Sequence, residues 1–280
     1  MIVSHALKIG TDILRKNNIS TFLLDAEILL SNATDLSREK LITNEDFLLK
    51  RNQKKIYFNY LRRRLKKEPV SQILNYKEFW SLKFYITKEV LCPRPDTELL
   101  VENIVKLNKK LKPQILDLGS GSGCIIISIL KQINGSRGVA LDISNKSIKI
   151  TKKNSQIHGL KKRIKFLNRP CEAINGKKFD IIVSNPPYIK THELQNLPDT
   201  IKLYEPKIAL NGGVDGLDLL KKVIYKSKGI LKKNGLFGIE IGNKQYLKIS
   251  EILKRNNFRE IKKIKDSNNN IRCIISTLKN

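Results

Sequence analysis

The spacing of apolar residues indicates helices in the first part of the chain. In residues 1–75, apolar side chains recur every three or four positions, as they do on the buried face of a helix. The face of the first predicted helix consists of Ala6, Ile9, Ile13 and Leu14. Residues 22–30 continue the pattern. A third predicted helix buries Tyr57, Phe58, Leu61 and Leu65. Because Pro69 ends this pattern, residues 1–75 are predicted to form a small helical domain.

A change of period separates this domain from the rest of the chain. Residues 78–90 (EFWSLKFYITKEV) alternate apolar and polar side chains and are rich in aromatic and β-branched residues, which is typical of a β-hairpin. We therefore expect residues 76–95 to be a hairpin linker between two domains.

Short strand-like runs alternate with helical segments in the remainder of the chain. The runs are residues 114–118, 137–143, 164–167, 179–185, 235–241, 258–264 and 271–278. Helical patterns start at residue 123 and cover residues 145–158, 217–231 and 245–256. Such alternation predicts an α/β fold, with a mostly parallel seven-stranded sheet and helices on both faces. Residues 96–280 are expected to form this domain.

The first candidate site is a glycine-rich loop directly after the first of these strands. Residues 117–123 read DLGSGSG, and glycines at alternate positions permit a tight turn and a close approach of backbone to ligand. The spacing is not that of a GxGxxG dinucleotide loop, and the GK[ST] ending of a P-loop is missing, so we predict a ligand without a pyrophosphate. The candidate ligand contacts are Asp117, Gly119, Ser120, Gly121, Ser122 and Gly123.

Asp142 is the second candidate, at the end of the next strand. The carboxyl edge of an open α/β sheet is where ligands bind, and this carboxylate could accept both hydroxyls of a ribose. It follows Asp117 by 25 residues, about one strand-helix-strand unit. Asp142 could instead cap the helix that starts near Asn145. The distance from the glycine loop favours the ribose role.

The most specific motif is the tetrad Asn185, Pro186, Pro187 and Tyr188, directly after the apolar strand of residues 179–184. The prolines lack N–H groups and have a fixed φ, so they hold the chain extended with carbonyl oxygens free to accept hydrogen bonds. Asn185 adds a side-chain acceptor, and Tyr188 adds a flat aromatic face. Any Asn-Pro pair can form a simple turn, but the full tetrad favours binding of a planar NH2 group, with Asn185, Pro186 and Tyr188 acting in the chemistry.

The glycine loop, Asp142 and the tetrad together resemble the class I, Rossmann-like S-adenosylmethionine-dependent methyltransferases, in the subset that methylates amino or amide nitrogen. Further segments resemble the protein-glutamine methyltransferases of peptide chain release factors, the PrmC or HemK family. These segments are residues 25–30 (DAEILL), 78–80 (EFW), 93–98 (PRPDTE), 204–206 (YEP) and 213–217 (GVDGL). The resemblance covers nearly the whole chain, including the N-terminal helices.

This resemblance implies methyl transfer from S-adenosylmethionine to the side-chain amide of the glutamine in the GGQ motif of class I release factors. It also implies that Asn185 contacts cofactor and substrate and that Cys171 touches the adenine. Residues 1–75 are expected to bind the protein substrate. The sequence departs from the family at Asn75, where a glycine is usual, and at residues 168–171 (NRPC), which replace an acidic and aromatic pair near the adenine.

Three charged residues of the PRPDTE segment are expected to support the hinge and the floor of the cofactor site. They are Arg94, Asp96 and Glu98. Charged groups flanking prolines are rarely buried without partners, so we expect each of them to have one.

Two other functions remain open at this point. An adenine-amino (N6) methyltransferase acting on DNA or RNA would also hold a planar NH2 group, but it must extract the base from its stack and would need a recognition domain. A basic RNA-binding protein with a vestigial cofactor pocket is the non-enzymatic alternative. The intact Asp117, Asp142 and Asn185 oppose it, whereas the altered residues 168–171 leave it open.

The chain carries a large excess of positive charge. Lys and Arg number 54 against 26 Asp and Glu, a formal net charge of +28. This excess attracts polyanions such as RNA or the ribosome, but abundant Lys, Asn and Ile with scarce Ala also fits a genome-wide nucleotide bias. The charge therefore does not decide the substrate, and the basic cluster of residues 62–67 is expected to be a solvated face.

Cysteine usage and hydropathy indicate the setting in which the chain works. Cys92, Cys124, Cys171 and Cys273 form no CxxC pair, which favours free thiols over a metal site or disulfides. Charged residues interrupt the N-terminal apolar residues, and no apolar run is long enough to span a membrane. We expect a cytoplasmic monomer that binds no metal.

Overall fold

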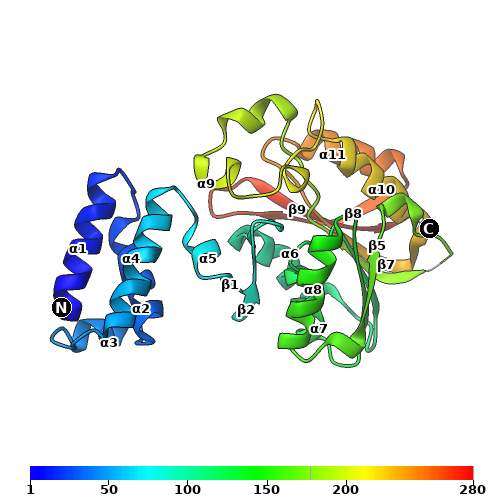
Figure 1. Ribbon diagram of the computed structural model, residues 1–280. Helices are drawn as coiled ribbons and strands as arrows, with labels where there is room; N and C mark the ends of the chain where they lie inside the picture. Colours follow the sequence, from blue (N-terminus) through cyan, green and yellow to red (C-terminus); the bar gives the residue numbers. More distant parts are fainter. Residues whose placement is uncertain (177, 280) are drawn as a thin grey trace. The chain divides into compact units, whose positions relative to one another are not determined.

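The computed structural model describes residues 1–176 and 178–279, which form two compact units (Figure 1). The first unit contains Met1–Tyr76 and Pro198–Tyr204, and the second contains Lys77–Leu197 and Glu205–Asn280. The first unit is therefore built from two separate stretches of the chain.

The first unit consists of helices. Their bounds are α1 Val3–Lys16, α2 Phe22–Thr34, α3 Arg38–Thr43, α4 Arg51–Leu65, α5 Val70–Ile73 and α9 Asp199–Lys202. Ala6 and Leu14 of the predicted apolar face of α1 are fully buried, whereas Ile9 is only half-buried. Gly10 completes that face, because a Cβ there would collide with the hydroxyl of Tyr57 on α4. The absence of a side chain lets the two helices pack closely.

A buried ion pair joins α2 to α4. Arg64 Nε donates a hydrogen bond to Asp25 Oδ2 at 2.6 Å, and the Thr21 hydroxyl donates to the same oxygen at 2.8 Å. Both charged side chains are buried, which such groups tolerate only when paired. The expectation that residues 62–67 form a solvated face is thus wrong for Arg64, whose guanidinium is needed to compensate Asp25.

The second stretch of this unit follows the tetrad in sequence. The Tyr204 hydroxyl donates to the Lys66 carbonyl at 2.7 Å, and Gln72 Nε2 donates to the Tyr204 carbonyl. Tyr204 therefore makes side-chain and backbone hydrogen bonds to residues close to the end of α4 and on α5.

The hairpin lies within the predicted linker but is shorter than residues 78–90. Its strands are β1 Tyr76–Phe79 and β2 Leu82–Tyr85. Trp80 and Ser81 both have φ of 54°, the left-handed conformation that a two-residue hairpin turn requires. Asn75 has φ of 58°, so the residue found where a glycine is usual occupies a left-handed position that asparagine tolerates better than most residues.

The sheet of the second unit confirms the predicted fold class. The strands are β3 Gln114–Leu118, β4 Arg137–Asp142, β5 Ile164–Asn168, β6 Phe179–Ser184, β7 Leu231–Glu240, β8 Phe258–Lys265 and β9 Ile271–Leu278. Within the described residues they form one sheet in the order β5-β4-β3-β6-β7-β9-β8. The strands from β5 to β7 pair in parallel, and β9 is antiparallel to both β7 and β8.

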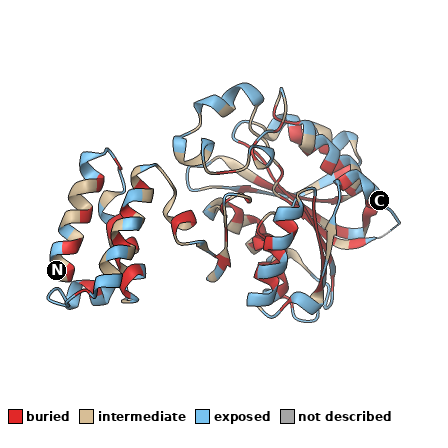
Figure 2. Cartoon of the chain, in the orientation of Figure 1, coloured by how far each residue is buried: buried red, intermediate tan, exposed pale blue. Residues whose placement is uncertain are grey.

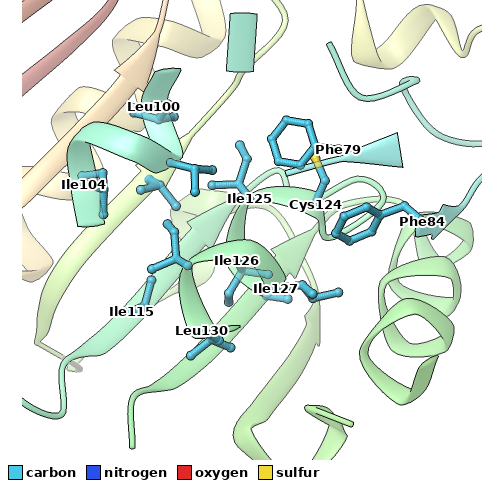
Figure 3. Packing of buried hydrophobic residues seen from close by; sticks show 14 of the residues in the cluster. Phe79, Phe84, Leu100, Ile104, Ile115, Cys124, Ile125, Ile126, Ile127 and Leu130 are labelled. Carbon is cyan, nitrogen blue, oxygen red and sulfur yellow. The ribbon is translucent and has the colours of Figure 1, made fainter. Parts of the chain in front are cut away.

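Helices and apolar clusters cover both faces of this sheet (Figure 2). The helices are α6 Pro95–Leu107, α7 Cys124–Gln132, α8 Asn145–Ile157, α10 Asp218–Ile230 and α11 Tyr246–Arg255. Neighbouring residues of a strand face opposite clusters, as Ile115 and Leu116 do. Figure 3 shows the cluster that α6 and α7 share with Phe79 and Phe84 of the hairpin. Burial on both faces explains why the central parallel strands β3 and β6 are mostly apolar.

Candidate active site

The strand order brings the predicted site residues to one edge of the sheet. Strand β3 lies between β4 and β6, so the segments that follow their carboxyl ends are neighbours. These segments border a cavity of about 470 Å³. The predicted residues that line it are Gly119, Ser120, Gly121, Ser122, Asp142, Cys171, Asn185, Pro186 and Pro187. Asp117, Gly123 and Tyr188 are not among the described residues that line the cavity.

The glycine loop has the backbone conformation that its sequence predicts. Gly119, Gly121 and Gly123 have φ of 78°, 54° and 81°, which other residues rarely adopt. A Cβ on Gly119 or Gly121 would meet no atom within 4 Å, so both face open space where a ligand can approach. Helix α8 holds the loop, because the Thr151 hydroxyl donates to the Gly121 carbonyl at 2.9 Å and Asn154 Nδ2 donates to the Ser122 carbonyl at 2.8 Å.

Asp117 is a buried carboxylate without a hydrogen-bond partner among the described residues. Burial and the nearby charge of Asp142 raise the pKa of Asp117 to about 7, against the opposing effect of the Ile126 N–H group. The hydroxyl of Ser120 is likewise buried and unpartnered within the described chain. Unpaired buried polar groups are costly, so both would be stabilised by a polar ligand, and Asp117 by a positive one.

Two backbone N–H groups fix the Asp142 carboxylate at the cavity. Gly121 N donates to its Oδ2 at 2.9 Å, and Ser144 N donates to its Oδ1 at 2.8 Å. Burial raises the pKa of Asp142, and these two N–H groups act in the opposite direction. The N-cap of α8 is Ser144, whose side chain accepts from Ser147 N at 3.2 Å. The capping alternative for Asp142 is therefore wrong.

The altered segment of residues 168–171 has a structural role at the cavity wall. Asn168 Nδ2 donates to the carbonyls of Asp142 and Ile143 at 3.1 and 2.8 Å, which holds the chain after β4. Cys171 is buried against the cavity, and burial raises the pKa of its thiol to about 11. The thiol is therefore neutral near pH 7 and offers a small apolar contact.

Three residues of the tetrad that carry hydrogen-bond acceptors, Asn185, Pro186 and Pro187, line the same cavity. Asn185 Nδ2 donates to the Thr97 hydroxyl at 3.1 Å, which leaves the side-chain carbonyl of Asn185 available. Among the described residues, the carbonyls of Pro186 and Pro187 have no donor. Tyr188 differs, since its hydroxyl donates to Glu240 Oε1 at 3.3 Å and accepts from Arg272 Nη2 at 3.0 Å. The stacking role of its ring stays a prediction.

A glycine-containing loop and one glutamine hold the tetrad in place. Gly212 N donates to the Ile189 carbonyl at 2.8 Å, and a Cβ on Gly212 would lie 2.8 Å from Tyr188 Cα. Gln245 Nε2 donates to the carbonyls of Tyr188 and Gly216 at 3.0 and 3.2 Å. The glycines at 212 and 216 are therefore required for backbone packing against the tetrad.

The three charged residues of the PRPDTE segment, Arg94, Asp96 and Glu98, all have partners. Arg94 Nη2 donates to both Glu205 oxygens, at 2.7 and 2.9 Å. Asp96 Oδ2 lies 3.4 Å from Arg272 Nε, and Glu98 accepts from the Trp80 N–H at 2.8 Å. These contacts tie the start of α6 to the hairpin and to β9.

Comparison with known proteins places both units in one family. Residues 5–74 match the family described as PrmC N-terminal domain, and residues 94–201 match the one described as Methyltransferase small domain. The release factor glutamine methyltransferase of Clostridium acetobutylicum is 40% identical over 274 residues, 95% of either chain. That of Clostridium botulinum is 38% identical over 270 residues, with the same coverage. The chain belongs to the release factor glutamine methyltransferase family.

Solved structures of lower identity share the fold of this family member. A ribosomal protein L11 methylase from Lactobacillus delbrueckii subsp. bulgaricus is similar with a TM-score of 0.52 and 20% identity, over 69% of this chain and 82% of that one. A methyltransferase from Pyrococcus furiosus has a TM-score of 0.54 and 15% identity, over 79% and 98%. These likenesses confirm the Rossmann-like methyltransferase fold.

The site fits S-adenosylmethionine, the methyl donor of such methyltransferases. The open space at Gly119 and Gly121 lets a ligand approach the backbone closely, and Asp142 has two carboxylate oxygens that a ribose could use. S-adenosylmethionine carries positive charge on its sulfonium and ammonium groups, which would stabilise the ionised form of the unpaired Asp117. The residues present are thus compatible with this cofactor.

Four residues around the tetrad were not predicted from the sequence. They are Thr97, Glu240, Gln245 and Arg272. A usable signal existed for two of them, because Glu240 and Arg272 are charges next to apolar runs of their strands, where a charge is expected to need a partner. Thr97 and Gln245 give no such signal.

The described part of the chain shows no metal-ligand cluster, disulfide bond or membrane-spanning helix. No group of three or more His, Cys, Asp or Glu residues there is arranged to hold a metal ion. All four cysteines are buried and free. No helix there has both the length and the apolarity that crossing a membrane requires.

Proposed function

We propose that this chain transfers a methyl group from S-adenosylmethionine to the side-chain amide nitrogen of the glutamine in the GGQ motif of peptide chain release factors. One observation carries the proposal. Asn185 and Pro186, which carry acceptor oxygens, line the same cavity as the glycine loop and Asp142. A pair of acceptors beside a methyl-donor site suits an NH2 group, and family relatives carry the corresponding name.

The cofactor would be held by residues from three strand ends. We assign the ribose hydroxyls to Asp142, the methionine end to residues 119–123 with Asp117 behind them, and the adenine to the wall that contains Cys171. Asn185 would lie where cofactor and substrate meet. S-adenosylmethionine, when bound, supplies an electrophilic methyl group on a positively charged sulfur.

The chain's contribution to catalysis would be orientation of a weak nucleophile. The lone pair of an amide nitrogen is delocalised into its carbonyl, so the nitrogen must be aligned with the methyl group. Asn185 Oδ1 and the Pro186 carbonyl would accept the two amide hydrogens and hold the nitrogen in line. Positioning of this kind can lower a barrier by about 7 kcal/mol or more, so no strong general base is required.

The two units would divide the work. Residues 1–75 would bind the release factor, residues 76–95 would link the parts, and residues 96–280 would carry the chemistry. A single copy would act, and the residues that line the cavity all belong to the second unit. The reaction would take place in the cytoplasm, where release factors act.

A labelling experiment tests this function. Purified protein is incubated with methyl-labelled S-adenosylmethionine and a bacterial release factor, beside RNA and DNA. We expect label in the release factor, and none when Asn185 is changed to Ala or when the GGQ glutamine is changed to Ala. Label found only in nucleic acid would replace the proposal with the adenine-amino methyltransferase.

A further inference from the structure

Glu240 is a fully buried carboxylate on β7, whose place among apolar neighbours calls for an explanation. It is 0% exposed, and burial raises its pKa while Arg272 acts in the opposite direction. Four hydrogen bonds connect it, directly or through one residue, to the tetrad. Each of these bonds has a donor and an acceptor, and the assignment of one bond determines which group donates in the next.

The assignment of donors and acceptors begins with the Glu240 carboxylate, because an ionised carboxylate can only accept hydrogen bonds. The Thr97 hydroxyl donates to Glu240 Oε2 at 2.6 Å. A hydroxyl has a single hydrogen, so Thr97 Oγ1 can only accept on its other side. It accepts from Asn185 Nδ2 at 3.1 Å. The Asn185 amide is therefore fixed with its NH2 toward Thr97 and its oxygen free.

The second oxygen of Glu240 is held by groups that favour its charged form against the effect of burial. Tyr188 donates its hydroxyl hydrogen to Oε1 at 3.3 Å, and Arg272 Nη2 lies 3.7 Å from the same oxygen. Arg272 also donates to the Tyr188 hydroxyl at 3.0 Å, which commits that hydroxyl to Glu240 as donor. A buried carboxylate next to a guanidinium remains ionised more readily than one alone.

On the basis of the function proposed above, we propose that Glu240 acts through Thr97 as a positioning residue that presents the Asn185 oxygen to the substrate amide, with Tyr188 and Arg272 supporting Glu240. The alternative amide rotamer would direct the Asn185 NH2 group at the substrate NH2 group, donor against donor. Fixing one rotamer before the substrate arrives avoids this arrangement and removes the cost of selecting it.

The experiment compares variants that alter the direction of the bonds while keeping the shapes of the side chains. Glu240→Gln replaces one of the two carboxylate oxygens by an NH2 donor, and Thr97→Val removes the hydroxyl. Each should lower kcat for release-factor methylation by about 100-fold, with the KM for S-adenosylmethionine within about threefold of the wild-type value. Thr97→Ser keeps the hydroxyl and should restore kcat to within about fivefold of wild type.

A matched control separates this role from general effects of core substitution. Thr277 is also buried on the sheet, and its hydroxyl has no partner within the described chain. Thr277→Val should leave kcat unchanged. Thr97→Val should add nothing in an Asn185→Ala background, because both changes remove the same oriented oxygen. Unchanged kcat in Glu240→Gln and Thr97→Val, or Thr97→Ser no better than Thr97→Val, would overturn the positioning role.

A second measurement does not depend on activity. The side-chain NH2 signals of Asn185, assigned by their loss in Asn185→Ala, are followed by nitrogen-15 NMR of the full chain. They should shift and exchange faster in Thr97→Val and shift in Glu240→Gln, but not in Thr277→Val. Identical signals in all variants would refute the inference whatever the activity shows. Absence of wild-type release-factor methylation would refute only the proposed function.

Discussion

At the scale of single residues, Asp117 links the stability of the fold to ligand binding. Its pKa of about 7 lies above the ordinary 3.8, because burial and the nearby charge of Asp142 disfavour the ionised carboxylate. A raised folded-state pKa means that stability is greatest below pH 3.8 and declines until the pH passes about 7. Asp117→Asn removes this decline. The free energy of unfolding of this variant, relative to that of the wild type, should therefore increase by about 2 kcal/mol between pH 5.5 and pH 8.

Denaturant unfolding at the two pH values measures this difference in stability. Calorimetric titration with S-adenosylmethionine measures the effect of the substitution on cofactor affinity. We expect weaker binding by Asp117→Asn at pH 8, because the variant no longer offers a negative charge to a positively charged ligand. A pH-independent stability difference would show that the folded-state pKa of Asp117 lies outside this pH range. Unchanged affinity would remove it from the cofactor site.

At the scale of elements, the contact between the tetrad and the loop of residues 210–217 depends on Gly212. A Cβ there would lie 2.8 Å from Tyr188 Cα and 2.9 Å from the Pro187 carbonyl oxygen, both backbone atoms. Gly212→Ala must therefore displace the tetrad itself. We expect the free energy of unfolding to fall by about 1–3 kcal/mol and kcat to fall by about 100-fold. Thermal unfolding and the labelling assay measure the two effects.

Gly229 on α10 provides the control for this substitution. No atom lies within 4 Å of a Cβ built there, and the residue is helical and exposed. Gly229→Ala should preserve kcat and raise the free energy of unfolding by about 0.5–1 kcal/mol, since alanine loses less entropy in a helix. Equal effects of the two changes would mean that close packing at Gly212 does not position the tetrad.

The elements that the sequence predicts best are those with a strong period. All seven strands follow the predicted segments, as do helices α7, α8, α10 and α11. The central strands contain apolar runs because both of their faces are buried, whereas the edge strand β8 is mostly charged and exposed. Helix α6 was not predicted, although Pro95 at its start is typical of a first helical turn. The hairpin was predicted too long, because its length depends on left-handed φ at Trp80 and Ser81, which neither residue type favours.

The candidate site was predictable as far as it is contiguous in sequence. The glycine loop, Asp142 and the tetrad each follow a strand, so the strand order alone brings them together. Thr97, Glu240 and Arg272 come from α6, β7 and β9, and their hydrogen bonds depend on strand pairing that no local pattern contains. The catalytic roles themselves remain predictions until the variants are measured.

At the scale of the whole molecule, the positive charge is unevenly shared between the units. Residues 1–76 and 198–204 contain 15 Lys and Arg against nine Asp and Glu, a net charge of +6. The remaining residues contain 39 against 17, a net charge of +22. Most of the excess therefore belongs to the unit that contains the cavity, and the N-terminal helices contribute little of it.

This distribution predicts different salt responses for RNA binding and for methyl transfer. Attraction of RNA to a diffuse basic surface releases counterions, so a labelled oligonucleotide should bind at least about tenfold more weakly at 200 mM than at 50 mM salt. Contacts of Asn185 and Pro186 with a neutral amide are not screened, so release-factor methylation should change by less than about threefold. Fluorescence anisotropy and the labelling assay measure the two. Sequence-dependent RNA binding that persists at 200 mM salt would instead indicate a dedicated polyanionic partner for the basic surface. Methylation that weakens with salt as strongly as RNA binding is expected to do would indicate the same.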